Sequence, residues 1–173
     1  INTTIPGTQH ILVIDMKKRL LKMTSLAAFV LAAGLFSAAN GQTVNGSIAG
    51  GTVRAGRTAK ATVYLNIPGG LHVNSNRPGS EYAIATRVTA RSTGGVKIGP
   101  VSYPRGKNRK FEFSADTINV YEGRTPFTFN VTVPANYRKY SVVVTVSVRY
   151  QACTDEVCYP PKTKTATISA SVL

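Results

Sequence analysis

Four runs of the chain share an alternation of apolar and polar side chains with a period of two, namely residues 61–67, 127–133, 142–150 and 166–172. This period places every second side chain on the same face of an extended strand, so each run predicts a half-buried β-strand. Residues 82–90 predict a further strand, and residues 96–103 predict a weaker one. After residue 41, no stretch longer than about two helical turns shows a helical period.

Glycine and proline residues separate these runs, as at residues 68–70, 94–95 and 104–106. Short strands with turn signals at roughly 8–12-residue spacing are typical of a sandwich or a barrel. Neither an internal repeat nor a linker interrupts residues 42–173. The pattern therefore predicts one all-β domain over residues 42–173.

The first 41 residues carry the features of an export signal. A basic segment at residues 16–19 precedes an apolar run at residues 26–36, which is shorter than the roughly 20 residues needed to span a bilayer. Small residues follow, so we expect a signal peptide cleaved near Gly41, with a retained membrane anchor as the alternative. Residues 1–15 precede the expected start at Met16 and are interpreted as an upstream extension.

The formal net charge of the chain is +14 at pH 7, which favours non-specific contact with anionic surfaces. Basic residues gather at residues 105–110, beside Phe111 and Phe113. Interleaved basic and aromatic side chains can bind single-stranded nucleic acid, but the export signal argues against that partner. We interpret the stretch as a solvated basic turn, with a contact to a membrane or to an acidic partner as the alternative.

Cys153 and Cys158 are the only cysteines of the chain, and they lie between two predicted strands. A tight turn there would bring the two sulfurs together at the mouth of a hairpin. Closing so short a loop gains little stability, and the polar Asp155 and Glu156 between the sulfurs predict an exposed loop. Pro160 stiffens the exit from the loop. These features favour a bridge that opens and closes, and a permanent structural bridge is the alternative.

We expect no metal and no cofactor. A structural zinc site needs four Cys or His ligands, and the chain after residue 41 offers only two cysteines and His72. A copper site of soft ligands has no more support, because both methionines lie in or before the signal segment. A cysteine-protease dyad that includes His72 has no further support in the sequence.

The cysteine segment resembles a known signature. The string Tyr150-Gln151-x-Cys153-x4-Cys158-Tyr159-Pro160-Pro161 is similar to that of the N-terminal periplasmic domain of the thiol:disulfide interchange protein DsbD. Residues 70–79, which include His72 and Asn74, and residues 120–123 resemble further stretches of these domains. The resemblance covers roughly residues 51–173 and implies an immunoglobulin-like β-sandwich, in agreement with the predicted strands.

The resemblance implies an electron relay by thiol–disulfide exchange, a component of protein-disulfide reduction in the periplasm and of cytochrome c biogenesis. A membrane-embedded thiol reductase domain would donate the electrons, and periplasmic thioredoxin-fold proteins would accept them from a monomeric domain. Cys158 would join the partner, and Cys153 would resolve the mixed disulfide. Some family members space the two cysteines by five residues instead of four. The family domain is usually fused to membrane helices and a thioredoxin-like domain, so we expect either a stand-alone version or a fragment.

The resemblance and the spacing imply which residues surround the cysteine pair, namely Tyr150, Gln151, Asp155, Glu156, Tyr159, Pro160, His72 and Asn74. Asp155 and Glu156 disfavour a nearby thiolate, which suits a reductant better than a strong oxidant. The alternative to the relay is an exported, non-redox immunoglobulin-like binding module whose disulfide is purely structural.

In the family, a loop carrying an aromatic residue lies over the cysteines, and the matching segment here is residues 109–121. Its aromatic candidates are Phe111 and Phe113. The spacing between Phe113 and Tyr121 departs less from the family pattern than that between Phe111 and Tyr121, so we predict Phe113 as the cap. The alternation of the two phenylalanines also fits two core residues of an ordinary strand.

Overall fold

The computed structural model describes residues 41–173, so the predicted signal peptide lies outside the described residues. These residues belong to one compact unit. The unit contains a single 3-10 turn and twelve strands: β1 (Thr43–Ile48), η2 (Ala49–Gly51), β2 (Thr52–Val53), β3 (Thr58–Asn66), β4 (His72–Asn74), β5 (Arg87–Ser92), β6 (Lys97–Ile98), β7 (Lys107–Lys110), β8 (Thr117–Tyr121), β9 (Arg124–Thr132), β10 (Ser141–Tyr150), β11 (Ala152–Cys153) and β12 (Lys162–Val172).

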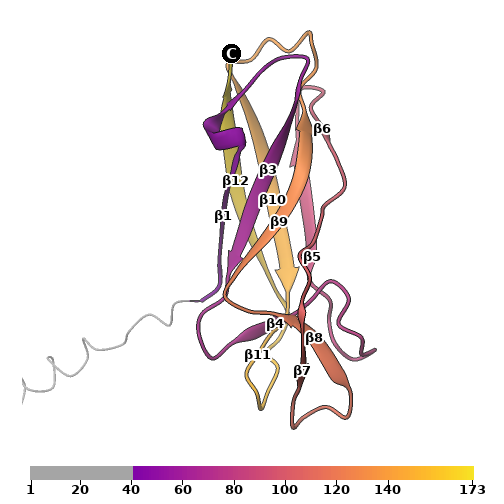
Figure 1. The fold of residues 1–173 in the computed structure, drawn as a ribbon. Helices are drawn as coiled ribbons and strands as arrows, with labels where there is room; N and C mark the ends of the chain where they lie inside the picture. Colours follow the sequence, from indigo (N-terminus) through magenta and orange to yellow (C-terminus); the bar gives the residue numbers. More distant parts are fainter. Residues whose placement is uncertain (1–40) are drawn as a thin grey trace, which may run out of the picture. The chain divides into compact units, whose positions relative to one another are not determined.

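Two four-stranded sheets form an immunoglobulin-like β-sandwich (Figure 1). The strand order is β1-β3-β9-β6 in one sheet and β2-β12-β10-β5 in the other. Neighbouring strands are antiparallel, except that β2 runs parallel to β12. Within residues 41–173, no helix has the length and apolar character needed to cross a bilayer.

The core lies between the inward faces of these two sheets. Every second residue of β10, from Val142 to Tyr150, is fully buried, because a strand places alternate side chains on one face. Phe127 of β9 is fully buried in the core, where its ring meets those of Tyr103 and Tyr121 edge to face. The four strands predicted from the alternating runs are thus confirmed as β3, β9, β10 and β12.

A third, smaller sheet of order β11-β4-β8-β7 lies at one end of the sandwich (Figure 1). It has a small core of its own, formed by Phe111, Ile118 and Val120. At its border, the chain turns from β8 into β9 at Gly123, whose φ of 62° favours a residue without a side chain. This sheet carries β11 and therefore the cysteine pair.

The strand predicted over residues 82–90 is wrong in its first half. Residues 80–83 form a turn in which the Ala83 amide donates to the Ser80 carbonyl, and Tyr82 is 85% exposed. The amide of Ile84 donates to the side chain of Gln151 instead of to a neighbouring strand, so β5 begins only at Arg87. The weak strand predicted over residues 96–103 is reduced to β6 and an isolated bridge from Ser102 to Thr128.

Candidate functional site

Cys153 and Cys158 form a disulfide across the tip of a hairpin at the end of the sandwich that carries the small sheet. The two residues lie directly opposite each other, with their Cα atoms 4.0 Å apart. Backbone hydrogen bonds flank the pair on both sides: Thr154 N to Val157 O and Tyr159 N to Ala152 O, each 2.8 Å. The hydroxyl of Thr154 also accepts the amides of residues 156 and 157, which holds the turn closed.

The two sulfurs differ in their access to solvent. Cys153 is fully buried, whereas Cys158 is partly exposed. Cys158 lines a cavity of about 400 Å³, and the other lining residues are Asn74, Ser80, Tyr82, Ala83, Phe113, Ser114, Ala115, Asp116, Ile118 and Gln151. A reagent or partner that enters this cavity therefore meets Cys158 and not Cys153.

His72 lies directly opposite Cys153 in the ladder between β4 and β11. Opposite residues of an antiparallel pair have their side chains on the same face, so Cys158, Cys153 and His72 form a row across the hairpin and the small sheet. The His72 side chain is only 3% exposed, and its Nε2 atom has no hydrogen-bond partner. Burial lowers the pKa of His72 below 6.5; Asp155 and Glu122 oppose this, and Arg109 adds to it.

The predicted cap segment is a hairpin, in which β7 and β8 flank a loop at residues 111–116. Phe111 is 5% exposed and stacks on the His72 ring, with ring centroids 4.2 Å apart. Phe113 is 40% exposed and stacks on Phe111 at 5.2 Å. Phe111 is therefore a core residue, whereas Phe113 lies at the surface and lines the cavity together with Cys158.

A polar network ties the cavity wall together. The Oε1 atom of Gln151 accepts hydrogen bonds from Asn74 Nδ2 at 3.0 Å and from the Ile84 amide at 3.3 Å. Asn74 Nδ2 also donates to the Ile84 carbonyl, and the Thr86 hydroxyl donates to the Asn74 carbonyl. Gln151 and Asn74, both predicted at the site, thus fix the loop before β5 against the strand that leads to Cys153.

The remaining predicted residues occupy different places. Tyr150 is fully buried in the sandwich core, where its hydroxyl donates to Gln42 Oε1 at 3.2 Å. Burial raises the pKa of Tyr150 above 10.0. Tyr159 and Pro160 are exposed beyond Cys158, as are Asp155 and Glu156 in the turn.

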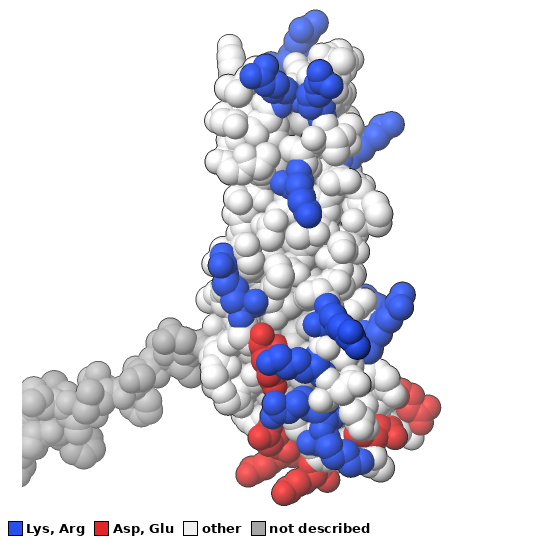
Figure 2. Space-filling view, viewed as in Figure 1, with Lys and Arg blue, Asp and Glu red and all other residues white. Residues whose placement is uncertain are grey.

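Acidic side chains gather at the cysteine end of the domain. On the face in Figure 2, every visible carboxylate lies there, whereas Lys and Arg are spread over the length of the sandwich. The six Asp and Glu residues of the described chain are Glu81, Glu112, Asp116, Glu122, Asp155 and Glu156. Asp116 lines the cavity itself. The carboxylates of this basic protein are thus concentrated at its cysteine end, where basic side chains also lie.

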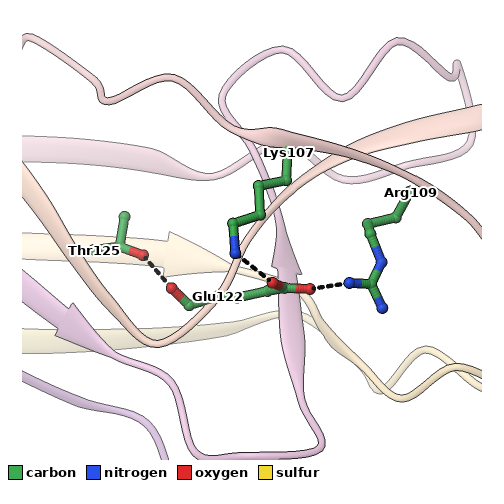
Figure 3. A network of polar contacts seen from close by, with 4 residues as sticks. All are labelled: Lys107, Arg109, Glu122 and Thr125. Carbon is green, nitrogen blue, oxygen red and sulfur yellow. Dashed lines mark hydrogen bonds and ion pairs between the residues drawn. The ribbon is translucent and has the colours of Figure 1, made fainter.

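The basic stretch beside the cap loop is an exposed strand, β7, and not the solvated turn predicted from the sequence. The strand forms because residues 107–110 pair with β8, and two of its side chains form ion pairs with a carboxylate just after β8. Lys107 Nζ and Arg109 Nη1 lie 3.1 Å and 3.2 Å from the two oxygens of Glu122 (Figure 3). Glu122 thus neutralises part of the basic charge of β7.

Sequence reasoning did not identify the cavity residues of the loop before β5, such as Ser80 and Tyr82. This loop matches no motif in the sequence, and contacts between residues far apart in the chain, such as the hydrogen bond from the Ile84 amide to Gln151, bring it to the cysteines. Within residues 41–173, no group of three or more His, Cys, Asp or Glu side chains is arranged to hold a metal ion.

One known structure agrees with the architecture. The N-terminal periplasmic domain of ScsB from Proteus mirabilis is similar at a TM-score of 0.51 and 10% identity, over 79% of this chain and 50% of the other. The chain thus spans about half the length of that structure, and the likeness concerns the fold alone. GAE domains of yeast GGA1 and of GGA2p from Saccharomyces cerevisiae match at TM-scores of 0.44 and 0.41, with 9% identity each, over 78% and 73% of this chain and 94% and 88% of those chains.

Sequence comparison identifies the family. No curated protein matches the chain significantly. Residues 47–170, however, match the family model described as the N-terminal part of the thiol:disulfide interchange protein DsbD. That span contains the small sheet, the cysteine hairpin and both large sheets apart from most of β1 and the last two residues of β12. The chain therefore belongs to the family of DsbD N-terminal domains, and its cysteine pair is that of a thiol:disulfide interchange domain.

Proposed function

We propose that this domain relays electrons in the periplasm, from a membrane-embedded thiol reductase domain to thioredoxin-fold proteins. The observation that carries the proposal is the unequal exposure of the two sulfurs. Cys158 opens onto a cavity large enough to admit part of a partner, and Cys153 is buried directly behind it. This is the arrangement needed by a pair in which one sulfur meets the partner and the other resolves the mixed disulfide.

The exchange proceeds in two steps. The Cys158 thiolate attacks the disulfide of an oxidised partner, so that one partner sulfur leaves and takes up a proton while a mixed disulfide forms. Cys153 then loses its proton and attacks the Sγ atom of Cys158. The bond to the partner breaks, and the second partner sulfur leaves and is protonated. Two electrons and two protons pass to the partner. The same steps in reverse, with the donor as the reductant, reduce the disulfide of the domain again.

Phe113 is the cap of this site. It is a large apolar side chain that stays 40% exposed at the rim of the cavity that Cys158 lines. Its loop is held at one end by the buried Phe111 and at the other by β8, so the tip can move without disturbing the core. The carboxylates of the turn and of the cavity wall suit a reductant, because they disfavour a thiolate on Cys158.

A redox titration tests this function. The folded domain is equilibrated with mixtures of reduced and oxidised glutathione, and the fraction of free thiol is measured after acid quenching and alkylation. We expect a potential in the range of redox proteins, above about −300 mV. A bridge that stays closed at every glutathione ratio would instead identify a structural disulfide in a non-redox binding module.

A further inference from the structure

His72 has no role in the exchange as described so far, although it lies on the row of residues that carries both sulfurs. Cys153 is the middle member of this row, with Cys158 opposite it on one side and His72 opposite it on the other. The resolving sulfur thus lies between the atom that it attacks and an imidazole ring. Directly opposite residues have Cβ atoms about 4.5–5.5 Å apart, which places the ring within reach of the sulfur.

The buried thiol needs a proton acceptor. A thiolate is the attacking species, and burial in apolar surroundings disfavours it. Cys153 is fully buried, so bulk water does not reach its sulfur. In the neutral Nδ1–H tautomer, the Nε2 atom of His72 presents a free lone pair, and it is buried without any hydrogen-bond partner.

The orphaned Nε2 atom also distinguishes the two redox states. A buried polar atom without a partner is costly, and a disulfide sulfur has no proton to offer it. In the dithiol state, the Cys153 thiol can donate its proton to Nε2. The reduced state therefore supplies the partner that this atom lacks when the disulfide is closed.

We propose that His72 is the proton acceptor of the resolving step: its Nε2 atom takes the proton of the Cys153 thiol as Cys153 attacks Cys158. When the donor later opens the disulfide, the same atom returns the proton to the departing Cys153 sulfur. This proposal rests on the relay function, because a bridge that never opens has no resolving step. No further reactant is needed, since the proton moves between two groups of the domain.

The charged groups around the ring support this role. The charges of Asp155 in the turn and of Glu122 just after β8 stabilise an imidazolium once it forms, and the charge of Arg109 in β7 opposes them. Burial outweighs both effects and keeps the imidazole neutral, which is the state required of a base. Asp155 is the rival acceptor, but it is exposed in the turn, and a solvated carboxylate is a weaker base than a neutral imidazole.

The resolving step can be observed alone with dithiobis(nitrobenzoate), a small coloured disulfide. The fully reduced domain releases one thionitrobenzoate when Cys158 attacks the reagent and a second when Cys153 attacks Cys158. The reagent gains two electrons, and the domain returns to its disulfide. The second release is intramolecular, so it does not depend on the access of the reagent to Cys153. Cys153→Ser, which can release only one equivalent, identifies the second phase.

The test compares the second phase of the wild type with that of His72→Phe, which keeps a ring for stacking on Phe111, and of His72→Gln. We expect the rate of the wild-type second phase to change little between pH 7 and 8.5. In both variants this rate should rise about tenfold per pH unit, because the Cys153 thiol must then lose its proton to solvent. At pH 7 the second phase of the variants should be slower than that of the wild type by a factor of ten or more. The first phase should be unchanged.

Two outcomes would overturn the proposal: a variant second phase with the pH profile of the wild type, or an equal slowing of both phases at every pH, which indicates a purely structural role. The measurement starts from chemically reduced protein, so it works even if the glutathione titration shows a structural bridge. A failure of the relay and a failure of His72 are therefore seen in different experiments.

Discussion

The imidazole ring of His72 stacks on the ring of Phe111, with centroids 4.2 Å apart and an angle of 11° between the planes. Phe111 in turn stacks on Phe113 with an angle of 7°, so three rings form a continuous stack from the buried row of sulfurs to the rim of the cavity. This stack keeps water from His72 and connects the core of the small sheet with the loop that we propose as the cap.

The stability of the domain should fall in mild acid because of His72. Burial lowers its pKa from the ordinary value of 6.5, so below pH 6.5 the unfolded chain binds a proton that the folded domain does not. The contribution of neutral His72 is complete above pH 6.5 and is lost as the pH falls toward the folded-state pKa, with a slope of at most about 1.4 kcal/mol per pH unit for one proton.

Urea unfolding of the oxidised domain at pH 7.5 and at pH 5 measures this effect. His72→Phe keeps the ring stack but cannot bind a proton, so its unfolding free energy should change less between the two pH values than that of the wild type. Carboxylates that do not interact with His72 contribute equally to both proteins and cancel in the comparison. If the two proteins lose the same stability, His72 is not held neutral by the fold.

Replacement of Phe111 by alanine should lower the stability of the domain far more than replacement of Phe113. Phe111→Ala removes a buried ring from the small core and should cost about 3–5 kcal/mol of unfolding free energy. Phe113→Ala removes an exposed ring and should change stability by no more than about 0.5 kcal/mol. In the folded, reduced domain, Phe113→Ala should nevertheless increase the rate at which iodoacetamide alkylates Cys158. Equal alkylation rates of the wild type and Phe113→Ala would mean that Phe113 does not cover the site.

The alternation of apolar residues predicted the four long strands because each has one face in the sandwich core, as the buried valines of β10 illustrate. The small sheet was not predicted: β4 has only three residues, all of them buried, so it shows no alternation. The cysteine pair, its hairpin and the neighbouring Gln151 and Asn74 were identified from the sequence. The loop before β5 was not, because its hydrogen bonds to Gln151 join residues that are far apart in the chain.

The difference in exposure between the two sulfurs predicts which of them can be trapped. Cys153→Ser leaves the partly exposed Cys158 free to attack a partner and removes the sulfur that resolves the complex. This variant should accumulate a mixed disulfide with an oxidised thioredoxin-fold protein, visible on a non-reducing gel and abolished by dithiothreitol. Cys158→Ser leaves only the buried Cys153 and should form at least tenfold less of the complex. Trapping by Cys158→Ser alone would reverse the two assignments.

The wall of the cavity should depend on the side-chain oxygen of Gln151. Gln151→Ala leaves the Ile84 amide without its acceptor and removes one of the two acceptors of Asn74 Nδ2, which should cost about 1–3 kcal/mol of unfolding free energy. Gln151→Glu keeps an oxygen at the same position and is the matched control. Amide hydrogen exchange in the folded domain gives the local readout: Ile84 should exchange faster in Gln151→Ala and stay protected in Gln151→Glu, while the β10 amides are unaffected in both. Since the loop that carries Ile84 also supplies Ser80 and Tyr82 to the cavity, its release should speed the alkylation of Cys158 as well. An Ile84 amide that remains protected in Gln151→Ala would show that the loop is held by other contacts.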